Sequence, residues 1–167
     1  MMSNRPGFSL IRPIVIVACA AIVLVILFIV FNPARRIRIK RNATRATDIA
    51  LILSAVQAYR TENGTLPPGI DTDAERVQLI GRNPGSCGVI TCADYVLPTT
   101  GCTIEHLGAS LQPFIATMPA DPKTGTDSDT RYFINRDAGG GVTVGACDPE
   151  SEDPSDALPP PVLEVTE

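Results

Sequence analysis

The sequence predicts an α+β fold, in which a long N-terminal helix carries a small C-terminal domain built on an antiparallel β-sheet. We expect the helix to have a membrane-spanning half and an amphipathic half. Three observations lead to this prediction: an uncharged apolar run from Ile14 to Phe31, apolar residues at helical spacing after it, and two strand-like segments around a glycine-rich turn near the C-terminus. Within the 167 residues we expect five segments, 1–7, 8–31, 32–63, 64–147 and 148–167.

The apolar run is long enough to cross a bilayer. At a rise of about 1.5 Å per residue its helix would span roughly 27 Å, close to the thickness of the hydrocarbon core. A buried core helix is the alternative, but a chain of this size could hardly cover a helix that is apolar on every side. A cleaved signal peptide is another, but "FIVFNPARR" at the end of the run contains no small-residue cleavage site. We therefore expect segment 8–31 to remain as an anchor.

The segment 32–63 predicts the amphipathic continuation of the helix. From Ala34 to Asn63 there is no glycine or proline, and Asn32-Pro33 marks an interruption before it. Asn63-Gly64 suits a left-handed C-cap, and two prolines follow to stop the helix. The apolar residues at helical spacing are Ala46, Ile49, Ala50, Leu53, Val56 and Tyr59.

The segment 64–147 predicts a compact domain with short helices and strands. Thr72 to Glu75 has the spacing of a capping box, which predicts a short helix ending near Gly81. A short strand is predicted at 94–97, and another helix at 104–116, in which Pro113 favours a break. The clearest signal is "TRYFINRD", "AGGG" and "VTVGA", which predicts a β-hairpin. The segment 148–167 is acidic and proline-rich, which predicts a disordered tail.

The cysteines indicate an oxidising compartment. Cys19 lies in the apolar run as a small apolar residue, and four more lie in the domain: Cys87, Cys92, Cys102 and Cys147. An even number in a small, loop-rich domain predicts disulfides. A zinc site is the alternative, but the spacing fits no paired motif and His106 does not complete one. Of three possible connectivities we favour Cys87–Cys92 with Cys102–Cys147.

The charge is distributed unevenly along the chain. Its distribution favours a C-terminal domain in the cytoplasm, whereas the predicted disulfides favour a domain outside it. Nine basic residues and one acid lie up to Arg60, and five basic residues and 17 acids follow it. The run Arg35 to Arg45, placed after an apolar helix, is typical of a cytoplasmic flank, whereas disulfides would place the domain outside. A nucleic-acid or anionic-lipid patch is a further alternative. No aromatic residue lies between these arginines to stack on a base, so DNA binding is possible but unsupported.

The order of these features resembles the type IV pilin and type II secretion pseudopilin family. The resemblance begins with the polar leader "MMSNRPG", the junction Gly7-Phe8 and "FSLI", which opens the uncharged helix. It continues with "YRTENGTLP" at the end of the amphipathic helix, with "MPADPKTG", and with the hairpin "YFINRDAGGGVTV". It covers residues 1–146.

The resemblance implies processing and then assembly. A prepilin peptidase would cut between Gly7 and Phe8 and methylate the new amine, and a glycine without Cβ suits an extended chain in a protease cleft. The helices would then leave the inner membrane and pack as the core of a filament, with the C-terminal domain outside. The implied partners are other pilin subunits, the peptidase and membrane lipid. The resemblance implies neither an enzymatic activity nor a small-molecule substrate.

Arg12 departs from the family pattern. The family usually has a glutamate here, proposed to pair with the amine of Phe8 on a neighbouring subunit, because an uncompensated charge in an apolar bundle is costly. An arginine would repel that amine. One alternative is a minor subunit at the filament tip that binds a surface or DNA, and another is that Arg12 anchors the helix at the cytoplasmic interface. A plain single-pass membrane-anchored binding module is the third alternative.

No residue pattern indicates catalysis or a cofactor. The chain has one histidine, and "AGGGVTVG" lacks the G-x-G-x-x-G pattern of a dinucleotide site. No metal site is predicted. Asp121, Asp127 and Asp129 offer oxygen ligands like those with which some pseudopilins hold calcium, but an acidic turn is the commoner explanation.

Overall fold

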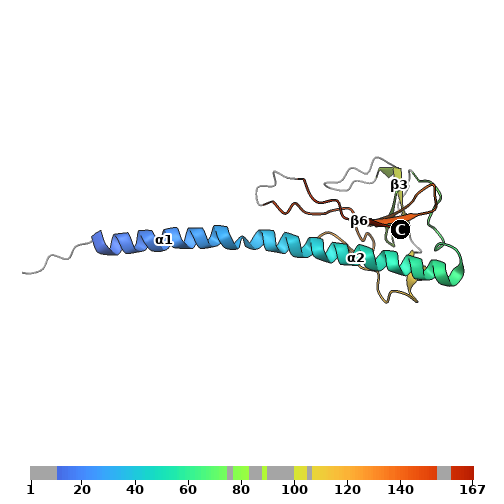
Figure 1. Ribbon diagram of the computed structural model, residues 1–167, viewed down its shortest axis with the longest axis horizontal. Coiled ribbons are helices and arrows are strands. Elements are labelled where there is room, and N and C mark those ends of the chain that lie inside the picture. The colour runs from blue at the N-terminus through green and yellow to red at the C-terminus, as the bar shows by residue number, and fades with distance from the viewer. Residues whose placement is uncertain (1–10, 75–76, 83–87, 90–99, 105–106, 154–158) are drawn as a thin grey trace, which may run out of the picture. The chain divides into compact units, whose positions relative to one another are not determined.

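The computed structural model describes residues 11–74, 77–82, 88–89, 100–104, 107–153 and 159–167. The chain divides into two compact units, residues 1–34 and 35–167. The first contains α1 (Ile11–Phe31), and the second contains most of α2 (Pro33–Asn63) together with a six-stranded sheet (Figure 1). The predicted α+β class, with an N-terminal helical region and a small C-terminal domain, is confirmed.

The end of α1 and both ends of α2 lie where the local sequence predicts. Asn32, between them, has a φ of 24°, a conformation that asparagine tolerates better than most residues, and Pro33 opens α2. At the other end Gly64 has a φ of 72°, and its N–H donates to the Arg60 carbonyl at 2.8 Å. Glycine supplies this left-handed C-cap without the strain a Cβ would add.

The sheet has the strand order β2-β3-β1-β4-β5-β6. Its strands are β1 (Val77–Ile80), β2 (Gly88–Val89), β3 (Thr100–Ile104), β4 (Tyr132–Arg136), β5 (Val142–Ala146) and β6 (Glu164–Thr166). The predicted hairpin is confirmed as β4 and β5, which pair from Tyr132↔Ala146 to Arg136↔Val142. Four strands, β1, β4, β5 and β6, form an antiparallel sheet. These four strands confirm the predicted small antiparallel sheet, and β3 extends it by pairing parallel with β1, which was not predicted.

The predicted helix from Thr72 to Gly81 is wrong, because Val77–Ile80 forms strand β1. Val77 packs against Phe133 on one side of the sheet, and Ile80 belongs to the main core. A strand places alternate side chains on the two faces of the sheet, so both Val77 and Ile80 are packed. This packing stabilises the strand more than a capping box at 72–75 would stabilise a short helix. The strand predicted at 94–97 lies outside the described residues.

The main core lies between α2 and the sheet. The buried residues of α2 at helical spacing meet those of β1, β4, β5 and the short helix α3 (Leu107–Leu111). α3 covers only part of the predicted helix 104–116, because the chain leaves the helix just before Pro113. The buried apolar members of this core are Ile49, Ile52, Leu53, Ala55, Val56, Ile80, Leu107, Leu111, Ile115, Tyr132, Ile134, Val142, Val144 and Ala146.

The described residues of the C-terminal segment 148–167 pack against the rest of the domain. Residues 148–153 run beside the N-terminal part of α2, and β6 then pairs with β5 at the edge of the sheet. The prediction of a disordered tail is therefore wrong for the described part. Its acids neutralise arginines of α2, while Leu163 and Val165 pack against the core, so the tail has more to bury than its composition indicated.

Candidate functional site: the seam between α2 and the C-terminal arm

The most extensive polar site of the described chain joins α2 to the segment that comes after β5. We call residues 149–167 the C-terminal arm, described at 149–153 and 159–167, and its contact with α2 the seam. Residues 35, 38, 42 and 45 of α2 are three or four positions apart, so a helix presents them on one face. Each of them donates a hydrogen bond to the arm.

A buried ion pair lies at one end of the seam. The side chains of Arg45 and Asp121 are both 0% exposed, and the guanidinium binds the carboxylate through Nε to Oδ2 and through Nη2 to Oδ1 at 3.2 Å. Burial would lower the pKa of Arg45, but its bonds to Asp121 and Glu150 raise it. Burial would likewise raise the pKa of Asp121, but Arg45 lowers it. Both groups are therefore charged at neutral pH, and each stabilises the other.

The loop after Asp121 is wrapped around its carboxylate. Oδ1 accepts the N–H groups of Lys123 at 2.8 Å and Thr124 at 2.9 Å, together with the Thr124 hydroxyl at 3.1 Å. A Cβ at Gly125 would lie 2.2 Å from the main-chain nitrogen of Asp121, so the turn requires glycine there. Arg45 and these donors together contact both oxygens of the Asp121 carboxylate. Asp129 likewise accepts from Arg131.

Glu150 is the acidic centre of the seam. Its carboxylate lies 3.2 Å from Arg41 Nη1, 3.2 Å from Arg45 Nη1 and 3.0 Å from Lys123 Nζ. Burial would raise the pKa of Glu150, but hydrogen bonds from Lys123 and Arg45 lower it. One carboxylate thus meets three cations from two segments, α2 and the Asp121 loop.

Asn42 binds the main chain of the arm. Its Nδ2 donates to the Glu150 carbonyl at 2.7 Å, and its Oδ1 accepts the Glu150 N–H at 3.0 Å. The next two carbonyls, of Ser151 and Glu152, accept from Arg38 at 3.3 Å and Arg35 at 3.1 Å. Three consecutive residues of the arm are therefore recognised through backbone atoms, whatever their side chains.

The chain is held firmly just before the arm begins. Arg131 binds the Asp148 carboxylate with two bonds, from Nε at 2.7 Å and from Nη2 at 2.8 Å, and these raise the pKa of Arg131. The Thr124 hydroxyl also lies 2.8 Å from this carboxylate, and its single proton is directed to either Asp148 or Asp121. The neighbouring Cys147 is buried and disulfide-bonded.

A second polar pair joins α2 to β4 and is partly buried. The Tyr132 hydroxyl donates to Asp48 Oδ2 at 2.7 Å. Burial raises the pKa of Asp48, although the bond from Tyr132 partly opposes this shift. Burial also raises the pKa of Tyr132, which therefore keeps its proton and remains the donor.

The disulfide prediction can be compared with the structure at Cys147. Its bonded partner lies outside the residues whose side chains are described, as do the side chains of Cys87, Cys92 and Cys102. Cys102 lies in β3, and the two strands β1 and β4 separate β3 from β5. Three strand spacings amount to about 14 Å, twice the Cα separation of about 7 Å that a disulfide tolerates. The strand order therefore argues against the predicted Cys102–Cys147 bond.

Of the predicted processing and assembly residues, Gly7, Phe8 and Arg12, the structure describes Arg12. Gly7 and Phe8 lie outside the described residues. Arg12 lies in the first turn of α1 with an exposed side chain, and Cys19 is free and exposed on the same helix.

α1 exposes a large apolar surface. Ile11 is 71% exposed, Val17 68% and Leu24 66%. Within the part of the chain that the structure describes, no helix has both the length and the apolar character needed to cross a membrane. The other large apolar side chains exposed on α1 are Ile14, Val15, Ile16, Ile22, Val23, Val25, Ile26 and Leu27.

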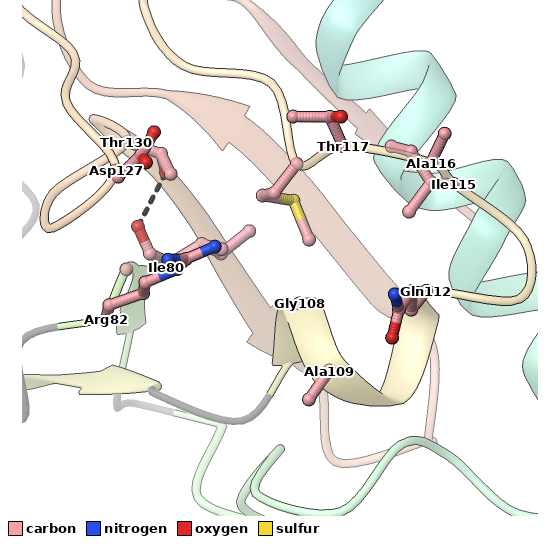
Figure 2. A pocket seen from close by; sticks show the side chains of 12 residues that line it. Ile80, Arg82, Gly108, Ala109, Gln112, Ile115, Ala116, Thr117, Asp127 and Thr130 are labelled. Carbon is pink, nitrogen blue, oxygen red and sulfur yellow. Dashed lines mark hydrogen bonds between the residues drawn. The ribbon is translucent and has the colours of Figure 1, made fainter.

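A cavity of about 480 Å³ lies beside α3. Arg82 and Asp127 lie on one side of it and Gln112 on the other, and Thr130 at its wall donates to the Ile80 carbonyl at 2.6 Å (Figure 2). Its described lining contains no histidine, cysteine, serine, lysine or tyrosine. Among the described residues no group of three His, Cys, Asp or Glu side chains could hold a metal ion.

The seam was not among the sites predicted from the sequence. The arginines by themselves indicate a membrane flank and the arm by itself indicates disorder, although their opposite charges and the helical spacing of Arg38, Asn42 and Arg45 are visible in the sequence. The seam has the chemistry of a peptide-binding site, with a main-chain clamp and a carboxylate pocket. In comparisons with protein-family models, curated proteins and solved structures, nothing matches this chain.

Proposed function

We propose that this protein is a structural, non-enzymatic subunit of a type IV pilus or type II secretion pseudopilus, assembled through its N-terminal helix. The observation that carries the proposal is the apolar surface of α1. A contiguous exposed surface of this kind marks a site for lipid or for other protein. Neighbouring α1 helices would cover it in a filament, and lipid of the inner membrane would cover it before assembly.

Two further observations support the proposal. The chain places an apolar helix before an amphipathic one, and the core-facing side of α2 carries a small sheet domain, which is the order of elements that the family resemblance implies. The disulfide at Cys147 favours a domain outside the cytoplasm, because disulfides persist in oxidising compartments. In this proposal the domain lies in the periplasm or on the filament surface.

N-terminal sequencing and electron microscopy test the proposal. In cells that contain a prepilin peptidase we expect a mature chain that begins at N-methylated Phe8, and a Gly7→Leu variant that keeps Met1. Purified surface or periplasmic filaments should then contain the mature chain. An intact Met1 on wild-type protein from such cells, with no filament, would overturn the proposal.

Arg12 favours a second candidate, a minor subunit near a filament end. Its exposed guanidinium at the position of the family glutamate would repel the Phe8 amine of an adjoining subunit, and a terminal subunit has fewer such neighbours. Quantitative mass spectrometry of filaments separates the two candidates. A minor subunit should be scarce and become more abundant with Arg12→Glu, whereas long homopolymers of wild-type protein would exclude this second candidate.

A further inference from the structure

The C-terminal arm is peripheral to the core that it covers. Among the described residues, the buried members of the main core lie between Ile49 and Ala146, and the described part of the arm adds the partly buried Leu163 and Val165. The chain is fastened immediately before the arm, at Cys147 and through the two bonds from Arg131 to Asp148. The buried apolar core, as described, therefore comes from residues before the arm, and the arm binds at its margin much as a separate peptide would.

The arm binds at two places. At the seam, Asn42 and two arginines bond its main chain while Glu150 enters a pocket of three cations. At the sheet edge, β6 adds three residues to β5, from Thr143↔Thr166 to Gly145↔Glu164, and the N–H of Glu167 donates to the Val142 carbonyl. Strand addition of this kind also occurs between separate chains.

Neither place depends on the arm belonging to the same chain. Among the described contacts, an empty seam would leave Arg41, Arg45 and Lys123 facing one another with only Asp121 to neutralise them, and β5 would expose an open sheet edge. The segment that fits both places is extended, carries a carboxylate at position 150 and supplies a short strand. A second copy of this chain carries that segment.

We propose that the arm is exchanged between copies, so that it binds its own domain in an isolated chain and the domain of the next copy in an assembly. The contacts are the same in both states, so concentration decides between them. A tethered segment has an effective concentration of the order of millimolar, and subunits packed side by side reach a similar range. This inference rests on the proposed function for its setting, and it supplies a head-to-tail link between neighbouring subunits.

A paired-cysteine variant tests the exchange. Thr143 and Thr166 are directly opposite, with hydroxyls 2.8 Å apart, and the bond between the flanking Glu167 and Val142 makes them a non-hydrogen-bonded pair. In a Cys19→Ala background, full-length Thr143→Cys/Thr166→Cys protein is oxidised in detergent, first dilute and then near millimolar, and also as filaments. We expect intramolecular bonds in dilute protein, and a ladder of covalent multimers on non-reducing gels of concentrated or filamentous protein. The single-cysteine variants are the control and should give dimers at most.

The outcomes separate the two proposals. A ladder in concentrated protein without filaments supports exchange and counts against the filament function. Filaments that contain only intramolecular bonds, or concentrated protein without a ladder, overturn the exchange.

A charge-reversal experiment needs no new thiols. An Arg41→Glu chain has two acids facing each other across its own seam, and a Glu150→Arg chain has an excess of cations across its own, so neither arm fits its own domain or that of an identical copy. In a mixed pair one mismatch disappears, because the unchanged arm of the first variant meets the unchanged seam of the second, with Arg41, Arg45 and Lys123 all present. Mass-labelled variants mixed near millimolar should therefore associate more with each other than with themselves in native mass spectrometry. Statistical mixing would overturn the proposal.

Discussion

Replacing Arg45 by methionine should destabilise the domain more than any other single charge removal in the seam. Methionine keeps much of the apolar stem but removes the guanidinium, so Asp121 stays buried without its counter-charge. The carboxylate keeps its main-chain donors, Lys123 and Thr124. Removing one partner of a buried pair typically costs about 3–5 kcal/mol, and these donors place the expected loss near the lower end, about 3 kcal/mol.

Tyrosine fluorescence gives the measurement. The chain has three tyrosines and no tryptophan, and Tyr132 is buried, so urea unfolding of the full-length protein in mild detergent changes its emission. A loss of about 3 kcal/mol is a large part of the roughly 5–15 kcal/mol that stabilises a typical domain. We expect it to lower the melting temperature by roughly 10 °C.

A matched arginine and a double variant make the test decisive. Arg60 also binds a carboxylate, that of Glu167 at 3.1 Å, but its side chain is 49% exposed, so Arg60→Met should cost under about 1 kcal/mol. Adding Asp121→Asn to Arg45→Met removes the unpaired charge and should recover much of the loss. If Arg45→Met costs no more than Arg60→Met, or if the double variant is no more stable than Arg45→Met alone, the ion pair is not what stabilises this region.

The same contacts lead to three further predictions. The pKa of Asp121 is lower in the folded protein than in the unfolded chain, so its ionised carboxylate stabilises the fold above the unfolded pKa, and this stabilisation is lost as the pH falls through the folded pKa. The urea midpoint should therefore drop on acidification below about pH 4, and it should drop less steeply in Asp121→Asn. The pKa of Asp48 is higher in the folded protein than in the unfolded chain, so the stability that its protonated form contributes is lost as the pH rises through the folded pKa. Asp48→Asn can still accept the hydrogen bond from Tyr132. It should therefore raise the urea midpoint at neutral pH and have little effect in acid. Peptide mapping without reduction should pair Cys147 with a cysteine other than Cys102, and a recovered Cys102–Cys147 peptide would contradict the strand order.

The elements with strong local signals could be predicted from the sequence. The bounds of α2 follow from the absence of glycine and proline between Ala34 and Asn63 and from the cap at Gly64, both of which act within a few residues. The β4–β5 hairpin could be predicted for the same reason, since its alternating residues flank a glycine-rich turn.

The elements that the sequence did not reveal depend on distant partners. β1 is a strand because β3 and β4 pair on its two sides and the core receives Ile80, although Thr72 to Glu75 carries a helix signal. β6 has three residues, and its partners in β5 lie about twenty residues earlier in the sequence. No local sequence pattern predicts this pairing.

The seam was hidden for a different reason. Each half of it has an ordinary explanation when read alone, since arginines after an apolar run suggest a membrane flank and a proline-rich acidic segment suggests disorder. The ion pairs of Glu150 with Arg41 and Arg45 show that the acidic arm and the basic face of α2 neutralise each other's charge. A search for oppositely charged segments of matched length would have found the candidates, but not Asn42, whose role depends on main-chain geometry.

The seam also resolves a conflict over orientation within the proposed function. Basic residues after an apolar helix normally indicate the cytoplasmic side, whereas the disulfide at Cys147 indicates an oxidising exterior. Arg41 and Arg45 have partners in the folded domain, and Arg45 is buried there, so the fold requires these charges on whichever side of the membrane the domain lies. Their presence in the sequence therefore does not by itself report topology. The disulfide favours a domain outside the cytoplasm, as the proposed function requires, and there Glu150 and Asp121 would neutralise these arginines.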